Sequence, residues 1–199
     1  MYKQFENAMA IVRWRDKPTI FLTATFDVKC KSMMKILKKG QSPYDRPDEI
    51  CRQFHIMHQS ILNDVIKNEI FGPVDAYTSS IEFQKRGAPH CHYLFWIRNL
   101  KAIPYNIDQI ISAEIPPEKP NNTLHKLVKE LMIHTCGSFC CKNGGQCKKH
   151  FPKNLTEETI ITDDAFPQYR RRAVGKGGYD VLPKGRKKRT TEKIINGSY

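Results

Sequence analysis

Alternating and helical patterns of apolar residues divide the first two thirds of the chain into strands and helices. Period-two alternation with β-branched and aromatic residues predicts strands, and apolar residues spaced three and four apart predict helices. The predicted strands span about residues 19–26, 74–84 and 90–97, and the predicted helices about residues 32–39, 47–65 and 122–133. This mixture, with a hairpin at its centre, predicts an α+β fold with a mainly antiparallel sheet and helices packed on it.

The apolar pattern stops after His134, where cysteines, glycines and basic residues take its place. We therefore expect three regions. They are an α+β core at residues 1–133, a Cys/His-rich appendage at residues 134–153, and a basic tail at residues 154–199.

The segment SIEFQKRGAPHCHYLFW carries two histidines two residues apart, His90 and His92. Residues two apart in a strand share a face, so both imidazoles point to the same side of the hairpin. If residues 85–89 form the turn, Gln84 faces His90 and Glu82 faces His92. Opposed Cβ atoms then lie ~4.5–5.5 Å apart, which is close enough for one ion to bridge the two strands.

Two neutral imidazoles and a carboxylate, with open positions remaining, are a donor set for a divalent cation. Mg²⁺ or Mn²⁺ would be usual for phosphate chemistry, and Zn²⁺ is possible. The alternative is a strand that exposes two polar residues on its wetter face without any metal. The carboxylate and the amide on the facing strand strengthen the metal interpretation.

Four of the seven cysteines crowd between residues 136 and 147, in polar sequence. Structural zinc takes four Cys or His ligands in a tetrahedron and can order a segment that has no apolar core of its own. The potential ligands are His134, Cys136, Cys140, Cys141, Cys147 and His150. The alternative is a solvated loop with free thiols, although free cysteines are usually buried rather than clustered in polar sequence.

Charge separates the two ends of the chain. The 199 residues carry 33 Lys and Arg against 20 Asp and Glu, a formal net charge of +13, and residues 142–199 alone carry +8. Such an excess of basic residues most often binds the phosphate backbone of a nucleic acid, and less often binds an anionic membrane or keeps the protein soluble. No apolar run approaches the ~20 residues of a membrane span, and the N-terminus lacks a signal-peptide pattern, so we expect an intracellular protein without a membrane partner.

Two compact cation runs concentrate the basic charge of the tail. They could contact phosphates of single-stranded DNA, act as a nuclear-import signal, or form a solvated tail. Phe166 and Tyr169 beside the first run offer stacking surfaces of the kind that single-strand binding uses. The residues expected to bind DNA are Arg170, Arg171, Arg172, Arg186, Lys187, Lys188 and Arg189.

Several segments resemble, in the same order, the replication-initiator domain of Helitron transposases, a domain also called Helitron helicase-like. The hairpin is similar to the histidine–hydrophobic–histidine motif of that family, and the resemblance runs from about Ile20 to Arg172. The other segments that carry it are FLTATF, DRPDEICRQF, IISAEIPP, LVKELMIHTCG, GGQCKKHFPK and DAFPQYRRR.

The resemblance implies an HUH-type single-strand DNA endonuclease. In that chemistry a histidine pair and a third polar ligand hold a divalent metal, and a tyrosine attacks the scissile phosphate to give a 5′-phosphotyrosine and a free 3′-OH. It implies that His90 and His92 are metal ligands, with Glu82 as the third ligand and Gln84 in reserve. It also implies that Cys91 is the hydrophobic residue that points to the core.

The same resemblance aligns three of the clustered cysteines with the family. The zinc ligands that it implies are His134, Cys136, Cys141 and Cys147. Cys140 and His150 then remain as spare ligands, and the spacings differ from those of a standard zinc finger.

The family's nucleophile is a pair of tyrosines spaced Tyr-X-X-X-Tyr on a helix. No two of the eight tyrosines here are three or four residues apart, and the resemblance places the pair beyond the end of the chain. We therefore expect a fragment of a longer transposase, whose helicase domain would follow, with no catalytic residue in this chain.

Two rival functions accompany the leading one, which is a metal- and single-strand-DNA-binding transposase domain in the nucleus. The first rival is a non-enzymatic, nucleic-acid-binding zinc module, a domesticated remnant that uses the cysteine cluster and the basic tail. The second is the inert product of a pseudogene.

Overall fold

The computed structural model describes residues 2–83, 87–134, 147, 150–162, 167–181 and 194–195. The chain divides into two compact units, Met1–Lys101 and Ala102–Tyr199. The predicted domain ranges of 1–133, 134–153 and 154–199 divide the chain elsewhere and stay predictions.

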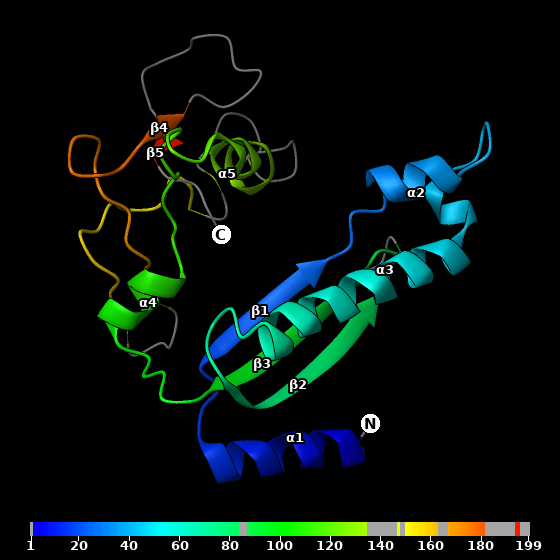
Figure 1. Ribbon diagram of the computed structural model, residues 1–199, viewed down its shortest axis with the longest axis horizontal. Helices are drawn as coiled ribbons and strands as arrows, with labels where there is room; N and C mark the ends of the chain where they lie inside the picture. Colours follow the sequence, from blue (N-terminus) through cyan, green and yellow to red (C-terminus); the bar gives the residue numbers. More distant parts are fainter. Residues whose placement is uncertain are drawn as a thin grey trace. The chain divides into compact units, whose positions relative to one another are not determined.

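The first unit is a three-stranded antiparallel sheet with helices around it (Figure 1). Its elements are α1 (Tyr2–Arg15), β1 (Ile20–Thr25), α2 (Lys31–Ile36), η1 (Pro43–Asp45), α3 (Pro47–Leu62), the π-helical turn η2 (Asn63–Lys67), β2 (Val74–Phe83) and β3 (Pro89–Ile97). The strand order is β1-β3-β2, so β3 is central and has an antiparallel partner on each side. Helices combined with an antiparallel sheet confirm the predicted α+β class.

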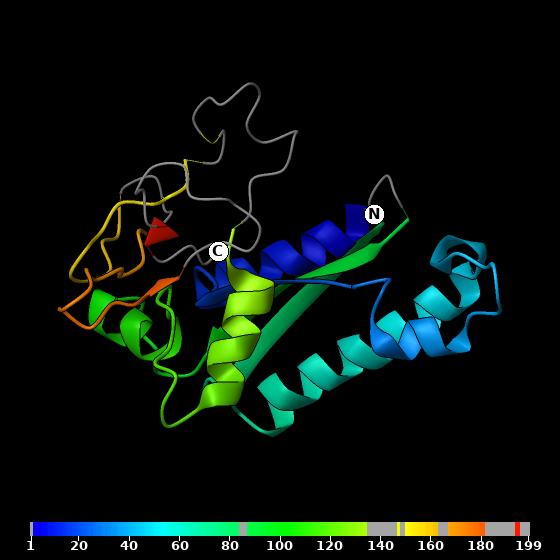
Figure 2. The same cartoon turned by 90° about the horizontal axis from the view of Figure 1, so that it is seen from above.

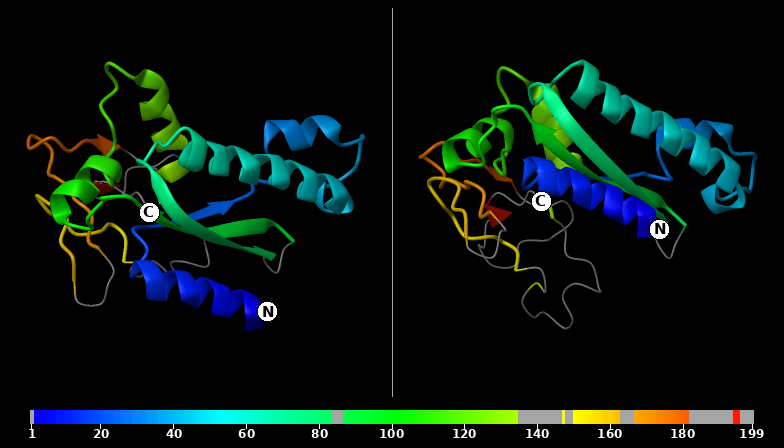
Figure 3. Two further views of the ribbon diagram at one scale, coloured as in Figure 1. Left: turned by 60° about the horizontal axis from the view of Figure 1, so that its bottom comes forward. Right: turned by 90° about the horizontal axis from the view of Figure 1, so that it is seen from below.

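Helices α3 and α1 lie on opposite sides of this sheet (Figures 2 and 3). Strand β3 alternates, with Cys91, Tyr93 and Phe95 fully buried at 0% exposure. Phe54 of α3 is also buried at 4%. The predicted inward orientation of Cys91 is therefore confirmed.

A polar contact joins α3 to the central strand within this core. The Tyr93 hydroxyl lies 2.7 Å from Nδ1 of His58, and the two rings stack. Burial lowers the pKa of His58, and the nearby His55 lowers it further. A neutral imidazole can accept the hydroxyl proton here, so His58 has a structural role.

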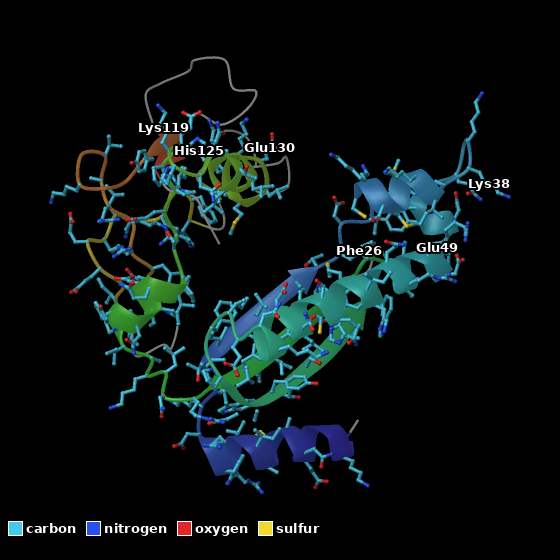
Figure 4. The ribbon with its side chains drawn as sticks, viewed as in Figure 1. Phe26, Lys38, Glu49, Lys119, His125 and Glu130 are labelled. Carbon is cyan, nitrogen blue, oxygen red and sulfur yellow. The ribbon has the colours of Figure 1, made fainter. Side chains whose placement is uncertain are left out.

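A backbone hydrogen bond extends the pairing of β1 with β3 by one residue beyond the end of β1. Phe26, labelled in Figure 4 at the end of β1, is buried, and its N–H donates to the Pro89 carbonyl at 3.1 Å. This bond holds the end of β1 against the start of β3, directly beside the first histidine of the hairpin.

The second unit contains mostly short elements. They are α4 (Pro104–Ile110), α5 (Asn122–Leu127), the π-helical turn η3 (Val128–Met132), β4 (Asp180–Val181) and β5 (Ile194–Ile195). Isolated bridges Thr156↔Arg171 and Ile160↔Gln168 join the segments between them. Ile115 and Val128 form a small apolar cluster with Ile133 packed against it.

The apolar pattern does not predict α1 and α4. Helix α1 has no acidic residue in its first turn, and Trp14 near its end is 69% exposed, so the usual start and burial signals are missing. The prolines after residue 103 indicate a loop, yet Pro104 occupies the first turn of α4. Proline is well suited to that position, because its missing N–H would have no partner in the helix.

Candidate metal centre on the β2–β3 hairpin

Strand alternation places the two histidines of β3 on the face opposite the core. Cys91 between them is buried, whereas the His90 and His92 side chains are 12% and 34% exposed. Glu82 on β2 shares their face, and its side chain is 63% exposed. The predicted convergence of these three side chains is therefore present.

The strand register differs from the predicted one by two residues. Glu82 pairs with His90, and Ser80 pairs with His92, so the predicted pairs Gln84–His90 and Glu82–His92 are wrong. The last pair of the hairpin is Phe83 with Pro89, which puts the five-residue turn one position earlier than predicted. Moving a turn by one residue shifts the pairing by two, which changes the partners but keeps every side chain on its face.

The distances from the Glu82 carboxylate to the two imidazole nitrogens are close to those between neighbouring ligands of one ion. Glu82 Oε2 is 3.4 Å from His90 Nε2 and 3.6 Å from His92 Nε2, and all three atoms lie within 4.8 Å of one another. With metal–ligand bonds of ~2.1 Å, neighbouring ligands are ~3.0 Å apart in an octahedron and ~3.4 Å apart in a tetrahedron. We call Glu82, His90 and His92 the hairpin triad.

Thr23 on β1 orients one of these ligands. Its Oγ1 lies 2.9 Å from Nδ1 of His92, and the two residues are paired across β1 and β3. A metal bound at Nε2 requires the imidazole proton at Nδ1, where Thr23 Oγ1 can accept it. Partners of this kind fix the tautomer and the ring orientation of metal-ligating histidines.

The sequence pattern predicts that β1 is a strand but does not identify its neighbour. Thr23 could therefore not be assigned to the metal site before the order β1-β3-β2 was known. The available signal was the alternation of threonines in FLTATF, which places Thr23 and Thr25 on one face. The reserve ligand Gln84 lies outside the described residues.

One pair of the predicted zinc ligands is in contact in the second unit. His134 Nε2 lies 3.3 Å from Cys147 Sγ, both residues are buried, and the His134 ring stacks on Phe151 at a centroid distance of 4.1 Å. His150 is exposed, and its N–H donates to the Cys147 carbonyl at 2.8 Å. Cys136, Cys140 and Cys141 lie outside the described residues.

Two of the arginines expected to bind DNA are paired with acids of the same unit. Arg172 donates to the Glu114 carboxylate through Nε at 2.8 Å and Nη2 at 2.7 Å, and its backbone N–H donates at 2.9 Å. Arg170 lies 3.7 Å from Asp108 and 3.9 Å from Glu114. Burial acts to raise the pKa of Glu114, but the hydrogen bonds and charge of Arg172 outweigh it and lower that pKa.

Arg171 is only 6% exposed, and its guanidinium donates to the Tyr169 carbonyl at 3.1 Å. Burial lowers the pKa of this guanidinium. The run of three arginines is therefore held within the second unit. The predicted DNA-binding residues Arg186, Lys187, Lys188 and Arg189 lie outside the described residues.

A different group of cations is exposed on the first unit, around α2. None of its ammonium groups forms an ion pair with another residue of the described part of the chain. The group, which we call the α2 lysines, consists of Lys29, Lys31, Lys35, Lys38 and Lys39. Figure 4 shows Lys38 in the turn that follows α2.

The comparison with known families supports the resemblance that the hairpin sequence indicated. Residues 1–95 match the family model described as the Helitron helicase-like domain at the N-terminus. The predicted resemblance to a Helitron-type N-terminal domain is thus confirmed over these residues, which contain the whole hairpin triad. The resemblance of the segments after residue 95 stays a prediction.

No curated protein matches the chain. Within the residues that the structure describes, no helix is long and apolar enough to cross a membrane.

Proposed function

We propose that the first unit binds a divalent cation and single-stranded DNA, as the replication-initiator part of a Helitron-type transposase. The observation that carries the proposal is the convergence of Glu82, His90 and His92 on one face of a hairpin that lies inside the family match. Three protein ligands leave positions open for a phosphate oxygen, as metal sites that act on substrates require.

The donor set fits Mg²⁺, Mn²⁺ or Zn²⁺, since it combines two imidazoles with one carboxylate. When bound, such an ion supplies Lewis-acid polarisation of a phosphodiester oxygen. Glu82 contributes negative charge that favours the ion, and Thr23 keeps the Nε2 lone pair of His92 available to it. The buried side of β3 keeps both imidazoles in place.

The proposal includes an HUH-type fold and, in the longer family protein, strand nicking and transfer. A tyrosine oxygen would form a bond to phosphorus, the bond from phosphorus to the 3′ oxygen would break, and that oxygen would leave as a 3′-OH. No residue of this chain is assigned as the nucleophile, because none of its eight tyrosines has the family's spacing. A helicase domain is the expected partner in the longer protein, and the nucleus its expected location.

The α2 lysines support the nucleic-acid part of the proposal. They begin four residues after Thr25, which pairs with His90, so Lys29 lies within ~14 Å of Thr25 along the chain. Each lysine that neutralises a phosphate of single-stranded DNA adds ~0.7 to the slope of log affinity against log salt. Five contacts would lower the affinity about 100-fold between ~50 and ~200 mM salt, and a nearly flat salt dependence would contradict them.

The test of the metal site is a Mn²⁺ titration of the full chain, followed by a single-stranded oligonucleotide binding assay. Removing a ligand should cost more than the 10–100-fold typical of an outer partner, so His92→Ala should lower Mn²⁺ affinity by more than about 100-fold. His55→Ala is the matched control, because His55 is an exposed histidine on α3. Equal Mn²⁺ affinity in His92→Ala and the wild type would refute the proposed site.

A second candidate function is the non-enzymatic, nucleic-acid-binding zinc module. The buried contact between His134 and Cys147 supports it, since a thiolate and an imidazole are the ligands that structural zinc prefers. We propose that Cys136 and Cys141 complete the set, with Cys140 and His150 as spares. Elemental analysis should then give about one zinc per native chain, and less than about half a zinc would count against the site.

The matched variants for this candidate are Cys147→Ser and Cys51→Ser, because Cys51 is an exposed cysteine on α3. Cys147→Ser should lose the zinc, and Cys51→Ser should keep it. Zinc retained in both variants would exclude Cys147 as a ligand.

A further inference from the structure

An exposed phenyl ring lies on the face of the sheet that carries the hairpin triad. Phe21 is the second residue of β1, where Ile20, Leu22 and Ala24 turn inward and Phe21 turns outward. Its side chain is 66% exposed. Leaving most of a phenyl ring in water forgoes most of the stabilisation that its burial would give, so β1 gains little stability from this residue.

The ring is in direct contact with a metal ligand. Phe21 stacks on the imidazole of His92 at a centroid distance of 5.6 Å and an interplanar angle of 21°. On β1 it lies two residues from Thr23, or ~7 Å along the strand, and Thr23 is the partner of His92. The Phe21 ring therefore provides an aromatic surface directly beside the His92 ligand of the triad.

No other exposed phenyl or phenol ring shares this face among the described strand residues. Phe83 and Tyr77 are 58% and 43% exposed, but they alternate with Glu82 and point to the opposite face. Trp96 lies on the triad's face, yet it is 4% exposed and donates from its indole to the Asp16 carbonyl. Among the described strand residues, Phe21 is thus the exposed aromatic ring beside the triad.

We propose that Phe21 is a stacking platform for one nucleobase of single-stranded DNA, adjacent to the phosphate held at the hairpin triad. The inference rests on the proposed function, to which it adds a subsite for a base. Every nucleobase has a π-face, so stacking of this kind tolerates any sequence and is worth roughly 5- to 150-fold in affinity per base. The ligand is a base of an unpaired strand, because a base within a duplex is already stacked on its neighbours.

The alternative role for Phe21 is to hold the His92 ring in place, and the two roles predict different results. A ring that only positioned His92 would change Mn²⁺ affinity when it is removed, whatever DNA is present. A base platform would change DNA affinity only where the DNA carries a base at the contacted position. Phe21→Leu retains an apolar contact with His92 but lacks an aromatic face.

The test uses the full chain loaded with Mn²⁺ and a short oligothymidylate that carries a single 2-aminopurine, moved along the strand from one oligonucleotide to the next. In the wild type, one position should show quenched fluorescence, because stacking on an aromatic ring quenches 2-aminopurine. Phe21→Ala and Phe21→Leu should abolish that quenching and weaken DNA binding about tenfold, whereas Phe21→Trp should retain both. Phe83→Ala, which removes another exposed ring on the opposite face, should leave both unchanged.

A second oligonucleotide, with an abasic nucleotide at the quenched position, allows the loss of the base and the loss of the Phe21 ring to be compared separately and together. The wild type should lose about as much affinity for this DNA as Phe21→Ala loses for intact DNA, and Phe21→Ala should lose nothing more. Equal losses for intact and abasic DNA, or unchanged quenching in Phe21→Ala, would overturn the platform alone. A wild type that binds no Mn²⁺, or binds DNA equally well without it, would instead overturn the proposed function.

Discussion

Two clusters of three ionisable side chains, one in each unit, have opposite internal chemistry. The hairpin triad consists of groups that offer lone pairs, and its donor atoms face one another at 3.4 and 3.6 Å. The acid–arginine cluster of Glu114, Arg170 and Arg172 joins a carboxylate to guanidinium donors, with contacts as short as 2.7 Å.

The two clusters differ in whether their own charges compensate each other or whether a cation could bind among them. In the acid–arginine cluster the opposite charges compensate each other, so its main contribution is to the stability of the second unit. In the hairpin triad a carboxylate and two imidazoles, 3.4 and 3.6 Å apart, are all groups that can coordinate a cation placed among them. A cluster of ionisable residues therefore indicates a cation site only when all of its members can act as ligands.

Removing the carboxylate of the hairpin triad should have the largest effect. Glu82→Gln keeps the shape but removes the negative charge of a ligand, and we expect divalent-cation affinity to fall by more than about 100-fold, as for His92→Ala. The free energy of unfolding without metal should change by less than about 0.5 kcal/mol, because Glu82 is an exposed surface residue. Isothermal titration with Mn²⁺ and urea unfolding of the same samples measure the two quantities.

The same substitution in the acid–arginine cluster should give the reverse result. Glu114→Gln weakens three hydrogen bonds from Arg172, and charge-assisted bonds are worth about 1.5–3 kcal/mol. We expect the free energy of unfolding of the second unit to fall by about 2 kcal/mol, with Mn²⁺ affinity unchanged. The comparison would fail if Glu114→Gln altered Mn²⁺ affinity as strongly as Glu82→Gln.

A smaller effect should come from the hydroxyl that orients His92. Thr23→Val keeps the β-branched shape and removes Oγ1, so Mn²⁺ affinity should fall about tenfold. Thr25→Val is the control, since Thr25 is an exposed threonine on the same strand and pairs with His90. Equal losses in the two variants would mean that the Thr23 contact contributes nothing particular to the site.

The smallest effect on the acid–arginine cluster should come from acid. The pKa of Glu114 is lowered in the folded chain, so its contribution to stability is complete above the ordinary value of 4.5 and declines as the pH falls below it. Protection of the Arg172 backbone N–H from hydrogen exchange should decrease over this range. Glu114→Gln should lack this pH dependence.

Apart from α1, the sequence predicts the main helices and strands of the first unit well because their patterns are local. The alternation in residues 74–97 determines which side chains share a face, and therefore brings Glu82, His90 and His92 together. The alternation does not determine which residues pair across the two strands. The predicted turn and the observed one both contain five residues, and both leave every side chain on the same face of the sheet. The choice between Ser80 and Glu82 opposite His92 depends on the turn itself.

Contacts between distant segments were not predictable in the same way. Thr23 reaches His92 from a strand 69 residues earlier in the chain, and Arg172 binds Glu114 across 58 residues. The run Arg170–Arg172 has the composition of a phosphate-binding segment, but composition does not reveal which acids lie nearby. Charge that is counted along the chain therefore overestimates the charge available to a ligand.

The alternation of β3 links the metal-binding face to the interior of the first unit. Cys91 and Tyr93 are fully buried on one side of the strand, while His90 and His92 are held on the other. Because the backbone between them is fixed by packing, an arriving ion has little conformational entropy to remove from its ligands. Substitutions in the apolar core, such as Cys91→Ser, should then weaken cation binding, although their side chains lie on the face of the sheet opposite the donor atoms.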